Sequence, residues 1–211
     1  IKHTLCDYAL TPDVSIVDDQ FVQTLPKRLI AWSGFEALGH AIESYVSTMA
    51  TDFTRGWSLE AIKTIFANLK KSYDGDLDAR KQMHDAATIA GMAYSNAFLG
   101  LEHSIAHTVG STFDIPSGVS DAIALPQVIR FNSKRPEKLA MWPHYSVYRA
   151  KSDYADIARA IGLTGSSDDE LVEKLVQKII DLAESVGIKM AYKGYGVDKA
   201  EFDKKVDELA V

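Results

Sequence analysis

Three histidines and one glutamate stand at helical spacing within a mostly apolar stretch of the sequence, residues 34–117. Glu36 and His40 are four residues apart, and so are His103 and His107. On a helix, residues four apart lie one turn above each other, with about 5 to 6 Å between their Cβ atoms. Each pair can therefore direct two side chains toward one point. Two such pairs on facing helices are a way in which helical bundles build metal sites.

The mixture of donor atoms limits the choice of metal. Carboxylate and imidazole together suit iron, zinc, nickel or manganese better than calcium or magnesium, which prefer shells of oxygen. A plainer interpretation stays open for each pair. A glutamate and a histidine four apart are most often a solvated surface pair, whereas two histidines in an apolar helix are costly to bury without partners. Glu43 and Glu102 lie close to these pairs in the sequence, and we interpret them as surface groups or as groups that support the ligands from behind.

The composition of the 211 residues is that of an ordinary globular protein, with 46% hydrophobic and 25% charged residues. The net charge of -6 argues against nucleic acid or an anionic membrane surface as the main partner. The single Cys6 cannot form an internal disulfide, which fits a reducing compartment. No apolar run approaches the roughly 18 to 20 residues of a membrane span. We therefore expect a cytoplasmic protein without nucleic-acid or membrane partners.

Apolar residues recur at three- and four-residue steps along most of the chain, which predicts an all-α domain. The expected helices cover residues 26–48, 52–73, 76–98, 101–109, 119–130, 152–161, 168–186 and 198–209, with a polar connector over 132–149. The third helix carries no charged residue from 86 to 101, so we expect it to be buried all round and central. Residues 1–25 differ, because the β-favouring residues 15–18 indicate the tail of a strand-containing region.

Two stretches resemble the sequence signatures of a known family, the iron-containing (group III) alcohol dehydrogenases. The first, residues 34–45, reads Gly-Phe-Glu-Ala-Leu-Gly-His-Ala-Ile-Glu-Ser-Tyr. The second, residues 90–107, reads Ala-Gly-Met-Ala-Tyr-Ser-Asn-Ala-Phe-Leu-Gly-Leu-Glu-His-Ser-Ile-Ala-His. Residues 7–13 are similar as well, closest to the alcohol dehydrogenase part of bifunctional aldehyde-alcohol dehydrogenases. The resemblance covers the chain from about residue 5 to residue 210.

The resemblance implies a fold and a division into domains. The chain would be the C-terminal helical domain of the dehydroquinate synthase-like/iron-containing alcohol dehydrogenase fold, with a short β-type lead-in. Residues 1–25 would be the tail of an upstream nucleotide-binding domain, and residues 26–211 the helical metal-binding domain, incomplete at its C-terminal end. Because the NAD(P)-binding domain would be missing, the 211 residues alone are expected to be inactive. A homo-oligomer is the expected assembly.

The resemblance also assigns the site residues by position. The family's metal shell of one aspartate and three histidines falls on Glu36, His40, His103 and Ser117. Glu36 keeps the carboxylate and adds one methylene group. Ser117 stands where the family has its last histidine, and we expect it not to be a ligand, because a neutral hydroxyl binds first-row transition metals weakly. His107 matches a histidine of the substrate pocket and is the expected catalytic residue, which relays a proton or orients the substrate.

The activity that the resemblance implies is the NAD-dependent interconversion of short aldehydes and alcohols by hydride transfer, with Fe²⁺, or alternatively Zn²⁺, at the site. The altered positions Glu36 and Ser117 motivate a second hypothesis, a degenerate metal-free helical domain that serves oligomer or filament assembly. A third is a polyol dehydrogenase branch of the same superfamily that uses zinc.

Overall fold

The computed structural model describes residues 7–135 and 148–209, and these residues form an all-α domain without strands. The fold class expected from the sequence is therefore confirmed. In chain order the α-helices are α1 (Lys27–Val46), α2 (Asp52–Asp74), α3 (Leu77–Ala97), α4 (Leu101–Phe113), α5 (Ser117–Asn132), α6 (Ala150–Ala160), α7 (Asp168–Ser185) and α8 (Lys199–Leu209). Three short 3₁₀ helices accompany them, η1 (Tyr8–Leu10), η2 (Asp19–Val22) and η3 (Tyr192–Tyr195). In this described part, no helix combines the length and the hydropathy that crossing a membrane requires.

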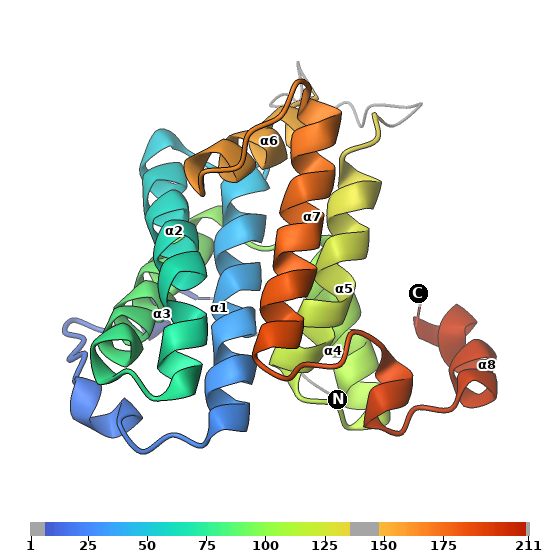
Figure 1. Cartoon of the computed structure of the whole chain (residues 1–211), viewed down its shortest axis with the longest axis horizontal. Coiled ribbons are helices and arrows are strands. Elements are labelled where there is room, and N and C mark those ends of the chain that lie inside the picture. Colours follow the sequence, from blue (N-terminus) through green and yellow to red (C-terminus); the bar gives the residue numbers. More distant parts are fainter. Residues whose placement is uncertain (1–6, 136–147, 210–211) are drawn as a thin grey trace.

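Helix α1 is the central element of the bundle. Figure 1 shows it between α2 and α3 on one side and α5 and α7 on the other, and it contacts α2, α3 and α5 along its length. Its side chains Phe35, Leu38 and Ile42 are completely buried. Residues on several faces of α1 are covered, and its polar residues Glu43 and Ser44 are buried, although Ser33 is exposed. That placement matters for the candidate site residues that α1 carries.

Helix α3 is not the central helix that its lack of charge predicted. It buries one stripe, made mostly of alanines such as Ala86, Ala90 and Ala93, while Met92 on the other face is 47% exposed. The prediction was wrong because absence of charge is not the same as apolarity. The segment also contains hydroxyl and amide side chains that are stable in water, among them Ser95 and Asn96, which are exposed.

The residues before α1 contain 3₁₀ turns rather than the expected strand. Residues 15–18 have no regular secondary structure, and the Asp18 carboxylate accepts a hydrogen bond from the Gln20 amide at the start of η2. A strand needs a neighbouring strand for its backbone groups, and the described residues supply none. Arg80 of α3 instead fastens this segment, donating to the carbonyls of Gln23 and Ser72. Most of the expected polar connector, residues 136–147, lies outside the described residues.

Helix α5 approaches α1 so closely that the two backbones touch. A Cβ atom added to Gly118 would lie 1.9 Å from the carbonyl oxygen of Trp32, which no real contact allows. Pro126 lies inside α5, whose start is set instead by Pro116 in the N-cap position. The contact between Gly118 and Trp32 therefore fixes where the first turn of α5 meets α1, one turn before Glu36.

Replacing Gly118 by alanine tests this close approach. We expect Gly118→Ala to lower the free energy of unfolding by about 2 kcal/mol or more, because the new methyl group meets a backbone oxygen that cannot move alone. The matched control is Gly56→Ala in α2, where an added Cβ meets nothing within 4 Å. That control should raise stability by roughly 0.5 to 1 kcal/mol. Urea unfolding followed by circular dichroism measures both, and equal stability of the two variants would contradict the close packing.

A second prediction concerns the start of α7 and its pH dependence. The Glu170 carboxylate accepts hydrogen bonds from Lys174 and from the amide and hydroxyl of Ser166, and these bonds lower its pKa to about 2. A depressed carboxyl pKa stabilises the fold above the unfolded value of 4.5, and this stability is lost as the pH falls from there toward 2.

Glu170→Gln should therefore lower the melting temperature at neutral pH, and the difference from the unmodified chain should shrink as the pH falls toward about 3. Thermal unfolding at low ionic strength measures this difference. The matched control is Glu184→Gln near the other end of α7. Its melting temperature should stay close to that of the unmodified chain at every pH. A Glu170→Gln deficit that persists unchanged at low pH would refute the prediction.

Candidate metal centre

Helices α1, α4 and α5 meet at one junction, and the three candidate histidines lie there. The ring of His40 in α1 stacks on the ring of His103 in α4, with 4.6 Å between centroids and 20° between planes. His107, one turn further along α4, lies edge-on to His103 at 5.7 Å. On its other side, His40 stacks on Tyr94 of α3 at 4.3 Å. The fold therefore brings together the histidines that the two sequence pairs contribute.

Glu36 and Ser117 lie at the same junction. Glu36 is half-buried on α1, one turn before His40, and Ser117 is the half-buried first residue of α5. The contact between Gly118 and Trp32 places this end of α5 one turn below Glu36. Glu36 also lies close enough to Asp121, one turn along α5, to affect the pKa of that carboxyl group. The four predicted positions thus come from three helices that contact one another.

The tightest group of ligand atoms in the described residues is a different one. Glu43, Glu102 and His103 each offer one atom, and these three atoms lie within 4.8 Å of one another. Glu36 and His40 are not in this group. Of the two interpretations of Glu43 and Glu102, the structure excludes the surface one, since only 3% of Glu43 and none of Glu102 is exposed.

Both oxygens of the Glu43 carboxylate already accept hydrogen bonds from N–H groups of the protein. One oxygen, Oε2, accepts from the Gly100 amide at 2.8 Å, the His103 amide at 3.2 Å and the His103 Nδ1 at 3.0 Å. The other, Oε1, accepts from the Glu102 amide at 2.8 Å. A cation between these three side chains would have to displace the donors of the first turn of α4. We therefore regard the group as a hydrogen-bonded support of His103 and not as a metal site.

A second carboxylate shares the same ring nitrogen, and a third stands behind it. The Glu102 Oε2 lies 2.6 Å from His103 Nδ1, and the Asp121 carboxyl group is within hydrogen-bonding reach of Glu102. Burial, together with the charge of Glu102, raises the pKa of Asp121 to about 9. Burial also raises the pKa of Glu102. Because Glu102 has an imidazole beside it, we assign the shared proton to Asp121, which donates to an ionised Glu102.

The two carboxylates also determine the charge of His103. Burial alone would lower the pKa of this histidine, but the neighbouring carboxylates of Glu102 and Glu43 raise it to about 10. Its other ring nitrogen, Nε2, is buried and has no hydrogen-bond partner among the described residues. A metal binds a neutral imidazole, so it would have to displace the proton of Nε2; with Nδ1 donating to a carboxylate, Nε2 is the ring atom left to bind it. The unpartnered Nε2 and the stacked ring of His40 are the features of this junction that a metal ligand set could use.

Asp121 is a site residue that the motif search did not single out. It stands on the buried face of α5 beside Val119, Ala122 and Leu125, all of which are buried. A lone carboxylate on an apolar face was a usable signal, since such a group is seldom buried without a partner. Glu43 was one of the groups expected to support the ligands, but its partners in α4 could not be named, because they are 57 to 60 residues away in the sequence.

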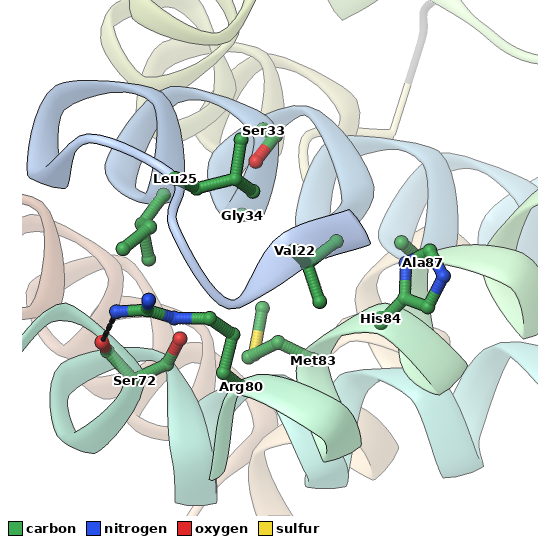
Figure 2. A pocket seen from close by; sticks show the side chains of 10 residues that line it. Val22, Leu25, Ser33, Gly34, Ser72, Arg80, Met83, His84 and Ala87 are labelled. Atoms are coloured by element: carbon green, nitrogen blue, oxygen red, sulfur yellow. Dashed lines mark hydrogen bonds between the residues drawn. The ribbon is translucent and has the colours of Figure 1, made fainter. Parts of the chain in front are cut away.

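A separate cavity lies beside the first half of α1. It has a volume of about 210 Å³ and is lined by residues of η2, α1, α2 and α3 or next to them, among them Leu25 and Met83 (Figure 2). None of the candidate site residues lines it. Arg80 in its wall donates a hydrogen bond to the Ser72 carbonyl, as Figure 2 shows. The cavity is therefore separate from the junction where His40, His103 and His107 lie.

The arrangement is that of a helical bundle with imidazoles from facing helices, the kind of scaffold in which metal sites are built. Comparison with known proteins identifies the family. Residues 30–210 match the Fe-containing alcohol dehydrogenase family, C-terminal part. The chain is 47% identical to aldehyde-alcohol dehydrogenase 2 of Entamoeba histolytica over 210 residues, covering 100% of this chain and 24% of that protein. It is 44% identical to the NADPH-dependent butanol dehydrogenase of Clostridium saccharobutylicum, covering 100% and 50% of the two chains.

A solved structure agrees with these sequence relatives. The iron-containing alcohol dehydrogenase of Thermococcus thioreducens superposes with a TM-score of 0.83 and 33% identity, over 97% of this chain and 48% of that one. The chain belongs to the iron-containing alcohol dehydrogenase family, and it corresponds to the C-terminal part of its members. It spans about half of the shorter relatives and about a quarter of the bifunctional ones.

The proton on Asp121 leads to a test. A carboxyl group whose folded pKa is about 9, against 3.8 when unfolded, must take up a proton on folding between these values. Its contribution to stability therefore falls as the pH rises from about 4 to about 9. Asparagine keeps the donor and cannot ionise. The melting temperature of Asp121→Asn relative to the unmodified chain should thus increase across this range, and Asp121→Ala, which also cannot ionise but supplies no polar group beside Glu102, should melt below Asp121→Asn at every pH. A pH-independent difference for Asp121→Asn would contradict the assignment.

Proposed function

We propose that this chain is the metal-binding helical part of a nicotinamide-dependent alcohol dehydrogenase that interconverts short aldehydes and alcohols by hydride transfer. The observation that carries the proposal is the buried Nε2 of His103, which has no partner among the described residues and whose ring stacks on His40. Membership of the iron-containing alcohol dehydrogenase family supports the reaction class. The names of the relatives, which include a butanol dehydrogenase and aldehyde-alcohol dehydrogenases, support short aldehydes and alcohols as substrates.

Glu36, His40 and His103 are the residues that we propose hold the metal, with Fe²⁺ as the first choice and Zn²⁺ as the second. A divalent metal held there would supply a Lewis acid for the carbonyl oxygen of an aldehyde. Ser117 is not a ligand in this proposal, because its hydroxyl is a weak donor for such metals. Three protein ligands leave an open position for the substrate oxygen, as a catalytic site requires.

His107 has the proposed catalytic role. It is half-buried, on the same helix as His103 and edge-on to its ring, so its imidazole lies beside the proposed ligand site rather than within the carboxylate group. From there it would orient the substrate and transfer a proton to or from the substrate oxygen. Hydride transfer belongs to the nicotinamide, NAD or NADP, which a separate nucleotide-binding domain would hold.

The division of the chain follows the same proposal. Residues 1–25 would be the tail of the nucleotide-binding domain, and residues 26–211 the helical domain, so that the 211 residues alone should show no dehydrogenase activity. A homo-oligomer is the assembly we propose for the whole protein. The direct test supplies iron, zinc or nickel to the chain joined to its nucleotide-binding domain, and then measures bound metal and aldehyde-dependent oxidation of NADH and NADPH. No activity with any of these metals would refute the proposal.

Position 117 offers a sharper test of the ligand set. Ser117→His would add an imidazole at the start of α5, beside the turn of α1 that carries Glu36. If Glu36, His40 and His103 form the rest of the shell, this fourth donor should tighten Co²⁺ or Zn²⁺ binding by about tenfold or more. Ser117→Ala is the matched control and should leave the affinity unchanged. A Ser117→His variant that is folded and binds no more tightly would exclude this ligand set.

A second function stays open, a metal-free helical domain that serves assembly into oligomers or filaments. The observation that favours it is that Glu36 and Ser117 depart from the ligand pattern that the family resemblance implies. Elemental analysis of the purified protein, combined with its mass in solution, separates the two functions. Bound metal in near-stoichiometric amount supports the dehydrogenase, whereas a metal-free protein that still assembles supports the structural role.

A further inference from the structure

We propose that Glu43 is the positioning residue of this centre: its carboxylate joins α4 to α1 and holds the His103 ring so that Nε2 faces the ligand site. This inference rests on the proposed function, since it describes how one of the proposed ligands is held. Glu43 would not contact substrate or metal. It would act entirely through His103 and through the first turn of α4.

The first argument comes from the start of α4. The first amides of a helix have no partner within the helix, and a side chain of the N-cap residue usually accepts from one of them. In α4 the N-cap residue is Gly100, which has no side chain. Glu43 of α1 supplies the missing acceptor, because it accepts from the amides of Gly100, Glu102 and His103. A carboxylate at this end is also favoured by the helix dipole.

The second argument comes from the ring of His103. The Oε2 atom of Glu43 that accepts from the His103 amide also lies 3.0 Å from His103 Nδ1, so one oxygen holds both the backbone and the ring of one residue. An ionised carboxylate can only accept, so Nδ1 must carry a proton. Glu102 reaches the same nitrogen at 2.6 Å, but it lies on α4 itself and cannot fix α4 against α1.

The third argument is the position of Glu43 along α1. It stands three residues after His40 and seven after Glu36, so it belongs to the helix that carries two of the proposed ligands. A bond from this helix to the ring of His103 sets the relation between the two parts of the ligand set. No other carboxylate that contacts His103 in the described residues comes from α1.

The fourth argument is the space that two glycines leave for this group. A Cβ atom on Gly100 would lie 2.8 Å from Glu43 Oε1. A Cβ atom on Gly39 would lie 3.0 Å from Glu102 Oε2 and 3.2 Å from the Cε1 atom of His103. Any larger residue at either position would push the carboxylates or the ring aside. Gly39 on α1 and Gly100 at the start of α4 therefore leave the space that the two carboxylates and the His103 ring occupy.

The test replaces Glu43 by glutamine, which keeps the size and removes the charge. Two properties of the chain are measured, the affinity for Co²⁺ from its visible absorption and the ring-nitrogen resonances of His103 by NMR. We expect Glu43→Gln to weaken Co²⁺ binding by about 10- to 100-fold, the usual effect of losing a group that orients a ligand. We also expect it to shift the His103 ring signals in the metal-free chain. The matched control, Glu60→Gln on the exposed surface of α2, should change neither property.

The ring signals separate this inference from the proposed function. If the unmodified chain binds no Co²⁺, the proposed function fails, and the His103 ring signals of Glu43→Gln still decide whether Glu43 positions the ring. A folded Glu43→Gln variant with unchanged ring signals overturns the inference. So does a folded variant with shifted ring signals whose Co²⁺ affinity equals that of a Co²⁺-binding unmodified chain.

A second variant covers the case in which Glu43→Gln does not fold. Gly100→Ala leaves Glu43 in place but moves its carboxylate, since the added Cβ would lie 2.8 Å from Oε1. It should shift the His103 ring signals and weaken Co²⁺ binding by a smaller factor. Gly91→Ala in α3 is its matched control, because an added Cβ there meets nothing within 4 Å. Identical ring signals in Gly100→Ala and Gly91→Ala would overturn the inference.

Discussion

A carboxylate removed from water must be satisfied by donors from the protein, and this constraint determines how α1 and α4 meet. Glu43 is buried in the central helix and receives four N–H donors, three of them backbone amides that α4 leaves unpaired at its start. The cost of burying the charge and the cost of the unpaired amides cancel only when the two helices are in this one arrangement. The position of His103 follows from the same arrangement, because it is the third residue of α4.

The opposite side of the site depends on contact between backbones rather than on charge. Gly118 lets the first turn of α5 lie against the carbonyl of Trp32, and the same helix then places Asp121 against Glu102. With Asp121 protonated, a neutral acid stands beside the carboxylate of Glu102 and the ring of His103. This combination limits the net charge that must be buried. Packing and proton placement are therefore coupled at this junction.

Local sequence features predicted the helices well, because their boundaries have local causes. The start of α2 at Thr51 and its end at Gly75 are examples, since Thr51 caps the first turn and Gly75 takes the left-handed conformation that ends the helix. The spacing of His40, His103 and His107 also predicted correctly that these rings lie close together. For α3 the prediction of a central position, made from its lack of charged residues, failed because burial depends on what packs against each face.

The supporting group of the site was not predictable in the same way. The contacts of Glu43 join residues 57 to 60 positions apart, and nothing in the residues around either partner specifies the other. Residues 15–18 show the converse, since their β propensity is real but is not expressed without a neighbouring strand in the described chain. Local propensity therefore determined the elements, and long-range hydrogen bonding determined which groups surround the histidines.

The two functions weighed above make the same demands on this supporting group. An enzyme needs His103 held with Nε2 directed to the ligand site, and a metal-free assembly domain needs α4 fixed to α1, and Glu43 serves both. Under either function, we therefore expect the residues that join these helices to be the same as in the dehydrogenase relatives. What distinguishes the functions is whether a metal binds, and there Glu36 and Ser117 depart from the ligand pattern that the family resemblance implies. The altered ligands and the intact support are independent features, because the hydrogen bonds that orient His103 act through Nδ1 and the backbone of α4.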